Sequence, residues 1–194
     1  MIELTPRFPK TCSNQLSLFA SEELPLPNSP YAMGRLLDER GRVSEASRLY
    51  HRAIEIEDHV PESYCNIGIL ESRMGRRVEA LAAFAHALTI RPLFVEARYN
   101  MALEYLGCED YLLAELHIEI AIQLEPETPE LHFCKAMVEI GKDEFAGALD
   151  ALENFRNLAP DERVEEVGAL ERMIEYGSKS SQSPASPSEL ETGG

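Results

Sequence analysis

The stretch YCNIGILESRMGRRVEALAAFAHALTIRP, residues 64–92, decides the fold of this 194-residue chain. Apolar residues recur at helical spacing on both sides of a Gly-Arg-Arg tripeptide at 75–77, which predicts two amphipathic helices joined by a turn. Small and bulky residues hold fixed places along the stretch: Tyr64, Ile67, Gly68, Ala80, Phe84, Ala87 and Pro92. Their spacing returns elsewhere in the chain.

These landmarks recur with a period of 34 residues. The matching small residues and prolines are Ala102, Ala114, Ala121 and Pro126, then Ala136, Ala148 and Pro160, and upstream Gly34, Ala46 and Ala53. A fixed period of this length is typical of a helical repeat array. The pattern resembles the tetratricopeptide repeat (TPR) family. That resemblance implies an all-α fold, a right-handed superhelical α-solenoid of stacked helix hairpins with a capping helix at its C-terminal end.

The register divides the chain into four repeats between two tails. The expected segments are a flexible arm at 1–26, repeats at 27–60, 61–94, 95–128 and 129–162, a capping helix at 163–176 and a disordered tail at 177–194. The arm is rich in Pro, Ser and Thr, and the tail is of low complexity. The last helix has one apolar stripe and is otherwise charged, as the end of an array requires.

Three departures from the repeat pattern carry structural expectations. Asp58 stands where the family has its final proline. Gly107 and Gly141 come two places earlier than the turn glycine Gly75. We therefore expect longer turns in the third and fourth repeats, with an aromatic residue packing at the start of each second helix, Tyr111 and Phe145.

The small landmarks have a steric role. Gly68, Ala102 and Ala136 are expected where the two helices of a hairpin cross closely, and alanines such as Ala114 let their axes approach to roughly 8–10 Å. Replacing Ala114 with leucine should overpack the crossing and cost about 1–3 kcal/mol.

The formal net charge is −16 at pH 7. Phosphate binding needs a basic surface, so the charge argues against nucleic acid as a direct ligand, and it argues equally against adsorption to anionic membranes. The charge is uneven: the segments 95–128 and 129–162 carry −7 and −5, whereas 27–60 and 61–94 carry −1 and +1. This polarity either orients a partner along the array or reflects solvated outer faces.

By the same resemblance, the first helix of each repeat lines a concave groove that binds peptides. The residues at the groove-facing offsets are Tyr31, Arg35, Asn66, Ile69, Arg73, Tyr99, Asn100, Leu103, Phe133, Cys134 and Met137. TPR arrays that capture chaperone C-terminal tails place cations at some of these offsets to hold a carboxylate. Glu96 and Glu130 stand at such places here, which argues against that function.

Two sets of groove residues recur at the repeat period. Asn66 and Asn100 form two rungs of an amide ladder, which either grips a peptide backbone or bonds a neighbouring helix. Ile69, Leu103 and Met137 form an apolar strip, which either accepts aliphatic side chains of a ligand or belongs to the core.

The arm contains one short island, Gln15-Leu16-Ser17-Leu18-Phe19. It is similar to the pentapeptide with which bacterial DNA-replication and repair proteins dock on the sliding clamp. In that motif Gln15 would make polar contacts, and Leu16, Leu18 and Phe19 would supply the apolar side chains. The alternatives are that the island caps the first helix pair or that the match is due to chance.

The sequence contains no recognisable catalytic constellation. The five histidines are dispersed, the four cysteines show no C-x-x-C spacing, and there is no H-E-x-x-H, Gly-rich phosphate loop or G-x-S-x-G. The scattered cysteines are typical of a reducing compartment. We expect no enzymatic activity, no cofactor and no metal.

The sequence therefore favours a non-catalytic scaffold or adaptor that binds a peptide or protein segment in the groove. The alternatives are a secretion-type chaperone for a partner protein, a regulatory subunit of a separate enzyme, or a clamp-tethered adaptor. No signal-peptide pattern or membrane-length apolar run is present, so we expect a cytoplasmic protein. We also expect a bacterial one. It should be a monomer or self-associate weakly through the ends of the array.

Overall fold

The structure is a computed structural model that describes residues 29–159 and 163–181. These residues form nine α-helices and no strand. The helices are α1 (Pro30–Glu39), α2 (Val43–Glu55), α3 (Val60–Arg73), α4 (Arg77–Ile90), α5 (Val95–Leu106), α6 (Tyr111–Leu124), α7 (Pro129–Gly141), α8 (Phe145–Leu158) and α9 (Val164–Ser181).

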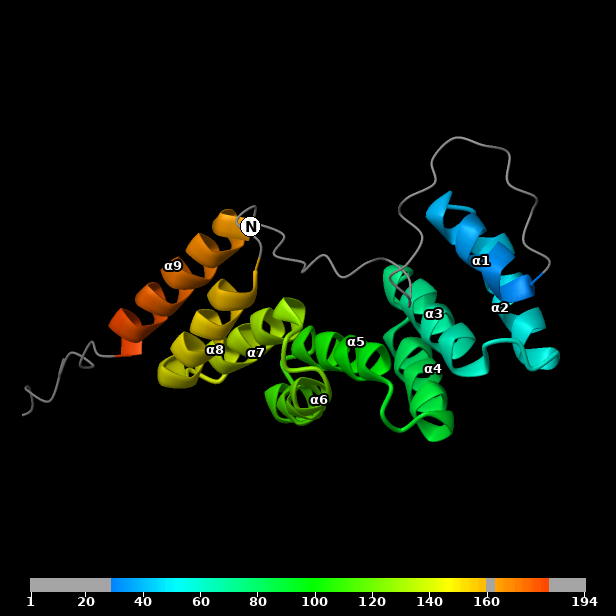
Figure 1. Cartoon of the computed structure of the whole chain (residues 1–194). Helices are drawn as coiled ribbons and strands as arrows, with labels where there is room; N and C mark the ends of the chain where they lie inside the picture. The colour runs from blue at the N-terminus through cyan, green and yellow to red at the C-terminus, as the bar shows by residue number, and fades with distance from the viewer. Residues whose placement is uncertain (1–28, 160–162, 182–194) are drawn as a thin grey trace, which may run out of the picture.

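The helices pair into four hairpins that follow one another in a curved row, with α1 and α2 at one end and α9 at the other (Figure 1). Each helix packs on its neighbours in sequence, and further contacts join α3 to α5, α5 to α7 and α7 to α9. Contacts restricted to near neighbours define a solenoid. The structure therefore confirms the all-α solenoid of helix hairpins with a C-terminal capping helix.

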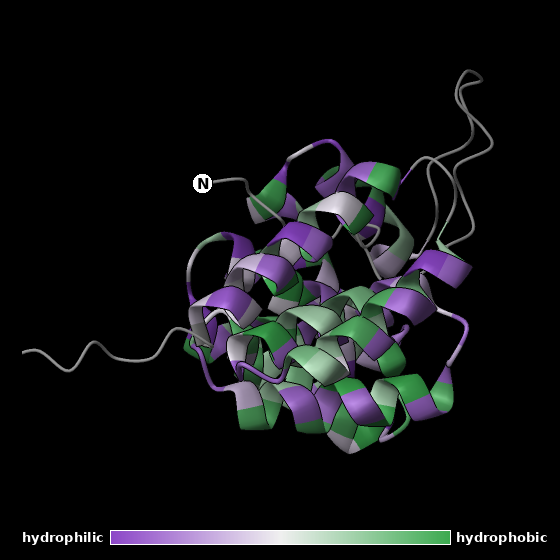
Figure 2. Cartoon of the chain, turned by 90° about the vertical axis from the view of Figure 1, so that its left-hand side faces the viewer, coloured by the Kyte–Doolittle hydropathy of each residue, from purple (hydrophilic) through white to green (hydrophobic). Residues whose placement is uncertain are grey.

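Within the described residues, the buried apolar side chains form four clusters, each joining one hairpin to the next element of the row. Figure 2 shows hydrophobic residues gathered between the stacked helices and hydrophilic residues along many of the turns. The alanines at the close crossings are fully buried: Ala46, Ala80, Ala114 and Ala148. The repeating small residues thus occupy the interior positions that the sequence predicts for them.

The glycines at the helix crossings match the size of the residue that faces them. A Cβ on Gly68 would stand 2.8 Å from Cζ of Phe84, and one on Gly34 would stand 2.9 Å from Cε1 of Tyr50. In the third and fourth hairpins alanine replaces the glycine and an aliphatic residue replaces the aromatic ring: Ala102 with Ile118, and Ala136 with Leu152. Close packing in protein interiors explains this exchange of volume.

The turns between paired helices also follow the repeat period. A residue with a left-handed backbone occurs every 34 residues, at Gly41 (φ 73°), Gly75 (φ 73°), Glu109 (φ 62°) and Asp143 (φ 60°). Gly107 and Gly141 are therefore not the turn residues. The connection in the third hairpin, residues 107–110, is one residue longer than those of the first two, as expected. The connection in the fourth, residues 142–144, is not longer, so that expectation is wrong.

Gly107 and Gly141 instead lie against a side chain from the hairpin before their own. That side chain belongs to the first residue of the hairpin's second helix. A Cβ on Gly141 would stand 2.6 Å from Cζ of Tyr111, and Nη2 of Arg77 donates to the carbonyl of Gly107 over 3.3 Å. Tyr111 and Phe145 do begin their helices, as predicted. Without a Cβ, these glycines let a large side chain lie across the helix backbone.

The capping helix is longer than predicted, and a glycine again allows close packing in it. The helix continues to Ser181, so residues 177–181 are helical and not part of a disordered tail. Gly177 lies under the ring of Phe145, where a Cβ would stand 2.6 Å from Cζ. The low complexity of residues 177–194 suggested a tail, but here Gly177 provides close packing of α9 on α8. Residues 182–194 lie outside the described residues, as does the predicted arm at 1–26.

Asp58 has a structural role in place of the missing proline. Its Oδ2 accepts hydrogen bonds from Oγ of Ser29 (2.5 Å) and the amide of Tyr31 (3.1 Å), and its Oδ1 lies 2.7 Å from Nδ1 of His59. Burial opposes ionisation of this carboxyl, but these hydrogen bonds outweigh it and hold its pKa below the ordinary value. Asp58 thereby caps α1 from the other end of the same repeat.

Candidate functional site

The inner side of the curved row is the candidate site. Figure 1 shows α3 and α5 on the side toward which both ends of the row rise, with α4 and α6 on the opposite side. On the inner helices, residues seven apart share one face because seven residues make nearly two turns. Ile69 on α3, Leu103 on α5 and Met137 on α7 occupy equivalent places and are partly exposed. They form the apolar row of this surface.

Several predicted groove residues lie in the core instead. The fully or nearly fully buried residues are Tyr31, Asn66, Tyr99, Phe133 and Cys134. Tyr31 stacks on His59, with ring centroids 4.6 Å apart, and Phe133 packs edge-on against Phe155 at 5.3 Å. These side chains pack within their own hairpin or against the next element of the row. In this structure these five side chains lie in the core and not on an open inner surface.

The asparagine pair shows the intramolecular alternative. Asn66 is 1% exposed. Asn100 Nδ2 donates to the carbonyl of Glu96 (2.7 Å), on its own helix, and lies 3.9 Å from Sγ of Cys65 on the preceding inner helix. The Asn100 amide therefore bonds within the chain and contacts α3 from α5.

The two predicted arginines belong to the first end of the inner surface. Nη1 of Arg73 on α3 lies 2.6 Å from Oδ1 of Asp38 on α1, which ties the first two hairpins together. Arg35 occupies the place that Ile69 has in the next repeat, and its Nη2 lies 3.7 Å from Glu39. The first repeat therefore presents paired charges where the later repeats present aliphatic side chains.

A row of glutamates runs beside the apolar row. Glu62, Glu96 and Glu130 each precede a member of the apolar row by seven residues, so the two rows share the inner faces of α3, α5 and α7. Glu62 lies 2.5 Å from Nη2 of Arg91, and Glu130 lies 2.8 Å from Nη1 of Arg163. The sequence analysis considered only Glu96 and Glu130, because they stand where chaperone-binding arrays have cations. The recurrence of glutamate at all three positions is the signal that it overlooked.

Glu96 is the middle member of this row, and its carboxyl is harder to ionise than usual. Burial is the largest cause of its raised pKa, and the negative charges of Glu125 and Glu62 add to the effect. Its own backbone amide and Arg91 act in the opposite direction. The inner surface therefore has its least compensated negative charge at α5.

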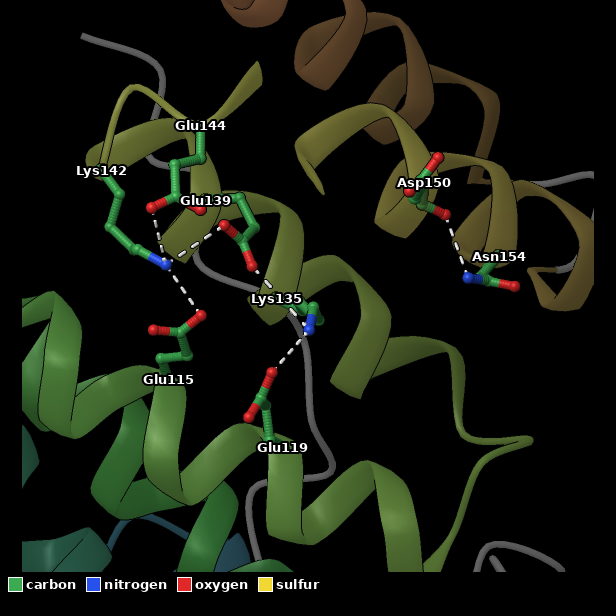
Figure 3. A network of polar contacts seen from close by, with 8 residues as sticks. All are labelled: Glu115, Glu119, Lys135, Glu139, Lys142, Glu144, Asp150 and Asn154. Carbon is green, nitrogen blue, oxygen red and sulfur yellow. Dashed lines mark hydrogen bonds and ion pairs between the residues drawn. The ribbon is translucent and has the colours of Figure 1, made fainter. Parts of the chain in front are cut away.

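A second polar cluster lies between the third and fourth hairpins, on α6, α7 and the turn before α8 (Figure 3). Nζ of Lys142 lies 2.7 Å from Glu115 and 3.5 Å from Glu139, and Nζ of Lys135 lies 3.0 Å from Glu119 and 3.8 Å from Glu139. Burial raises the pKa of Glu139, which is only 4% exposed, although both lysines oppose the shift. These ion pairs link α6 to α7 and to the turn after it, so the cluster joins the two hairpins.

Burial governs several of the groups that the described residues could offer for chemistry. Among the described residues, no group of three or more His, Cys, Asp or Glu side chains is arranged to hold a metal ion. Burial raises the pKa of the Cys134 thiol to about 12, which makes it a poor nucleophile. His117 stacks on Tyr105, and burial lowers its pKa. In the same part of the chain, no helix is both long and apolar enough to traverse a lipid bilayer. The island Gln15–Phe19 lies outside the described residues.

Comparison with known proteins identifies the repeat. The family model of the tetratricopeptide repeat matches residues 61–92, the second hairpin. The chain is 25% identical over 133 residues to a BBSome complex member, the BBS4 homolog of Drosophila melanogaster. The aligned residues make up 69% of this chain and 27% of that protein. The chain is 40% identical over 58 residues to a TPR repeat-containing protein of Treponema pallidum, which covers 29% of this chain and 24% of that protein.

A third curated relative is the peroxisomal targeting signal receptor of Candida albicans, 26% identical over 86 residues that cover 44% of this chain and 14% of the receptor. The chain thus spans less than a third of the length of each of these curated relatives.

Solved structures share the fold. MamA from Desulfovibrio magneticus RS-1 aligns over 82% of this chain and 100% of its own, with a TM-score of 0.62 and 18% identity. A tetratricopeptide repeat protein from Parabacteroides merdae aligns over 78% of this chain and 60% of its own, with a TM-score of 0.65 and 18% identity. At this level of identity the likeness establishes the fold alone.

Proposed function

This chain is a tetratricopeptide repeat protein, and we propose that it is a non-catalytic adaptor whose inner surface holds a segment of another protein. Repeats of this family are protein-interaction scaffolds, and stacking them produces extended concave surfaces. The names of two relatives agree with such a role, since one is a member of a complex and the other a receptor for a targeting signal. The proposal concerns binding only, and it assigns no reaction to the chain.

One observation carries the proposal. Ile69, Leu103 and Met137 stay partly exposed at equivalent places on three successive inner helices, although the residues around them are buried or bonded within the chain. Helices that pack together lie roughly 8–10 Å apart, so the row offers apolar contacts at regular intervals. Regular apolar contacts along a row suit the side chains of a bound helix or extended segment. The flexible thioether of Met137 adapts to the shape of such a side chain.

The outer side of the array is the competing surface. Leu112 and Leu116 on α6 are 74% and 52% exposed, and Leu149 on α8 is 53% exposed. Leu116 and Leu149 do not recur at the repeat period, because Ala82 and Asp150 stand 34 residues from Leu116 and Glu115 stands 34 residues before Leu149. Leu112 has one exposed apolar counterpart, Val78, in the preceding repeat. Singly exposed leucines are normal on protein surfaces. We take as the candidate the inner row, which recurs on three successive first helices.

Matched substitutions on the two sides test the proposal. Leu103→Asp places a charge in the inner apolar row, and Leu116→Asp makes the same change on the outer side. Each variant and the wild-type chain is purified with its associated proteins from the cells in which it naturally occurs, and these proteins are quantified by mass spectrometry. Circular dichroism melting confirms that each variant is folded.

The expected result is a partner that is present with wild type and Leu116→Asp and lost with Leu103→Asp. A partner that is retained by Leu103→Asp and lost with Leu116→Asp places binding on the outer side and contradicts the proposal.

A further inference from the structure

The inner surface combines two rows that run in parallel along the array. On each of α3, α5 and α7, a glutamate lies seven residues before a member of the apolar row: Glu62 before Ile69, Glu96 before Leu103 and Glu130 before Met137. Seven residues of α-helix span about 10 Å along the axis. A segment that contacts the apolar row therefore passes within reach of the glutamate row, provided that it carries long side chains.

The cations that neutralise the ends of the glutamate row are already engaged. Arg91, the partner of Glu62, has its guanidinium 4.7 Å from the ring centroid of Phe94. Arg163, the partner of Glu130, lies at the same distance from Phe155 and also 2.5 Å from Glu166. Each arginine is thus held in place by several contacts.

The middle of the row lacks such a partner. Among the residues that the structure describes, Glu96 makes no ion pair within 4.0 Å, and its nearest charged neighbours include Glu125 as well as Arg91. Burial and these like charges raise the pKa of its carboxyl. The third repeat as a whole, 95–128, has eight acidic residues and one basic residue. The centre of the inner surface is therefore short of positive charge.

We infer that the segment bound by the inner surface is basic: its aliphatic side chains contact Ile69, Leu103 and Met137 while a lysine or arginine pairs with Glu96. The inference rests on the proposed function, since it specifies the ligand of the same surface. A cation at this place relieves the repulsion between Glu96 and Glu125, and partial burial strengthens the new ion pair relative to a fully exposed one. An acidic segment would meet the same charges with repulsion.

The probe is a phage-displayed library of random 16-residue peptides, selected on the purified full chain. Selected peptides are then synthesised, and their affinities are measured by fluorescence anisotropy for wild type, Leu103→Asp, Glu96→Gln and Glu153→Gln. Glu153 on α8 is exposed and distant in sequence from both rows, so Glu153→Gln is a control of equal charge change. Titrations at low and high salt separate ionic from apolar contributions.

The expected result is an enrichment of lysine and arginine among aliphatic residues in those peptides whose binding is lost with Leu103→Asp. Glu96→Gln should weaken these peptides roughly three- to tenfold, as expected for a partly buried ion pair, and Glu153→Gln should leave their affinities unchanged.

Two further results separate a failure of the basic-ligand inference from a failure of the proposed function. Peptides that depend on Leu103 but show no basic enrichment, or that bind Glu96→Gln as tightly as wild type, overturn the basic ligand and leave the proposed function standing. A library that yields no peptide sensitive to Leu103→Asp overturns the proposed function itself.

Discussion

The ring of Phe84 lies so close to Gly68 that a Cβ on the glycine would stand 2.8 Å from Cζ of the ring. The two residues belong to α3 and α4, and their contact sets how closely these helices cross. In the fourth hairpin the equivalent pair is Ala136 and Leu152, both buried. Each hairpin therefore pairs a smaller residue with a larger partner and a larger residue with a smaller one, which keeps the combined volume of the two side chains similar, as close packing requires.

The Gly68–Phe84 contact makes a testable prediction. Gly68→Ala overpacks the crossing and should lower the free energy of unfolding by about 1–3 kcal/mol. Phe84→Leu, added to Gly68→Ala, recreates the pair found in the fourth hairpin and should recover part of the loss. Urea denaturation of the two single variants and the double variant gives the coupling energy. Additive effects of the two substitutions would show that this contact does not limit the crossing.

The left-handed turn residues give a second prediction. Glu109 and Asp143 adopt positive φ angles of 62° and 60° at the places where the first two hairpins have Gly41 and Gly75. A left-handed backbone costs a residue other than glycine roughly 1–2 kcal/mol. Glu109→Gly should therefore raise the stability by about 1 kcal/mol, despite the greater freedom of glycine in the unfolded chain.

The matched control for the turn is Gly75→Ala, which should lower the stability because alanine disfavours the same backbone conformation. Both changes are measured as shifts in the urea midpoint. A stabilising Gly75→Ala would mean that the turn can adopt another backbone conformation.

Asp58 makes a prediction about pH. Its folded pKa lies below its ordinary value, so the unfolded chain binds the proton more readily and the carboxylate stabilises the fold above that ordinary value. This contribution is lost as the pH falls through the folded pKa. Asp58→Asn keeps an acceptor for Ser29 and Tyr31 but removes the charge. At pH 7 it should cost a fraction of the 0.5–2 kcal/mol typical of a lost helix cap.

The measurement for Asp58 is thermal unfolding of wild type and Asp58→Asn between pH 2 and 7. The difference between them should shrink at the acid end of this range. A difference that is constant across the range would mean that the charge of Asp58 contributes nothing.

The pKa of Glu96 is shifted in the direction opposite to that of Asp58, which gives the fourth prediction. Its folded pKa is raised, chiefly by burial, so the charged carboxylate weakens the fold above that pKa and the cost disappears as the pH falls through it. Glu96→Gln should therefore raise the melting temperature at pH 7 while weakening a basic ligand. Calorimetry at pH 4 and pH 7 should show a larger gain at pH 7. A lower melting temperature at pH 7 would show that the carboxylate stabilises the free protein.

The repeat period made the fold predictable, because every close helix crossing needs a small residue at the same place in the repeat. Gly68, Ala102 and Ala136 are buried where the period puts them. The role of Gly141 was not predictable from spacing, since it depends on the ring of Tyr111 from the preceding repeat. The extension of α9 beyond residue 176 depends in the same way on contact between distant residues.

The candidate site was predictable only in part. Offsets within the repeat identify the inner helices, and Ile69, Leu103 and Met137 are partly exposed on them as expected. The same offsets also selected Asn66 and Tyr99, which are buried because neighbouring first helices approach closely enough to cover them. How much of a helix face its neighbour covers is a tertiary property, and a linear pattern does not contain it.

The most direct test of the central claim is methyl NMR of the chain with a peptide selected on its surface. The account predicts that titration shifts the methyl signals of Ile69, Leu103 and Met137 and leaves those of Leu112, Leu116 and Leu149 in place. Shifts confined to the three outer leucines, with the inner methyls unchanged, would contradict it.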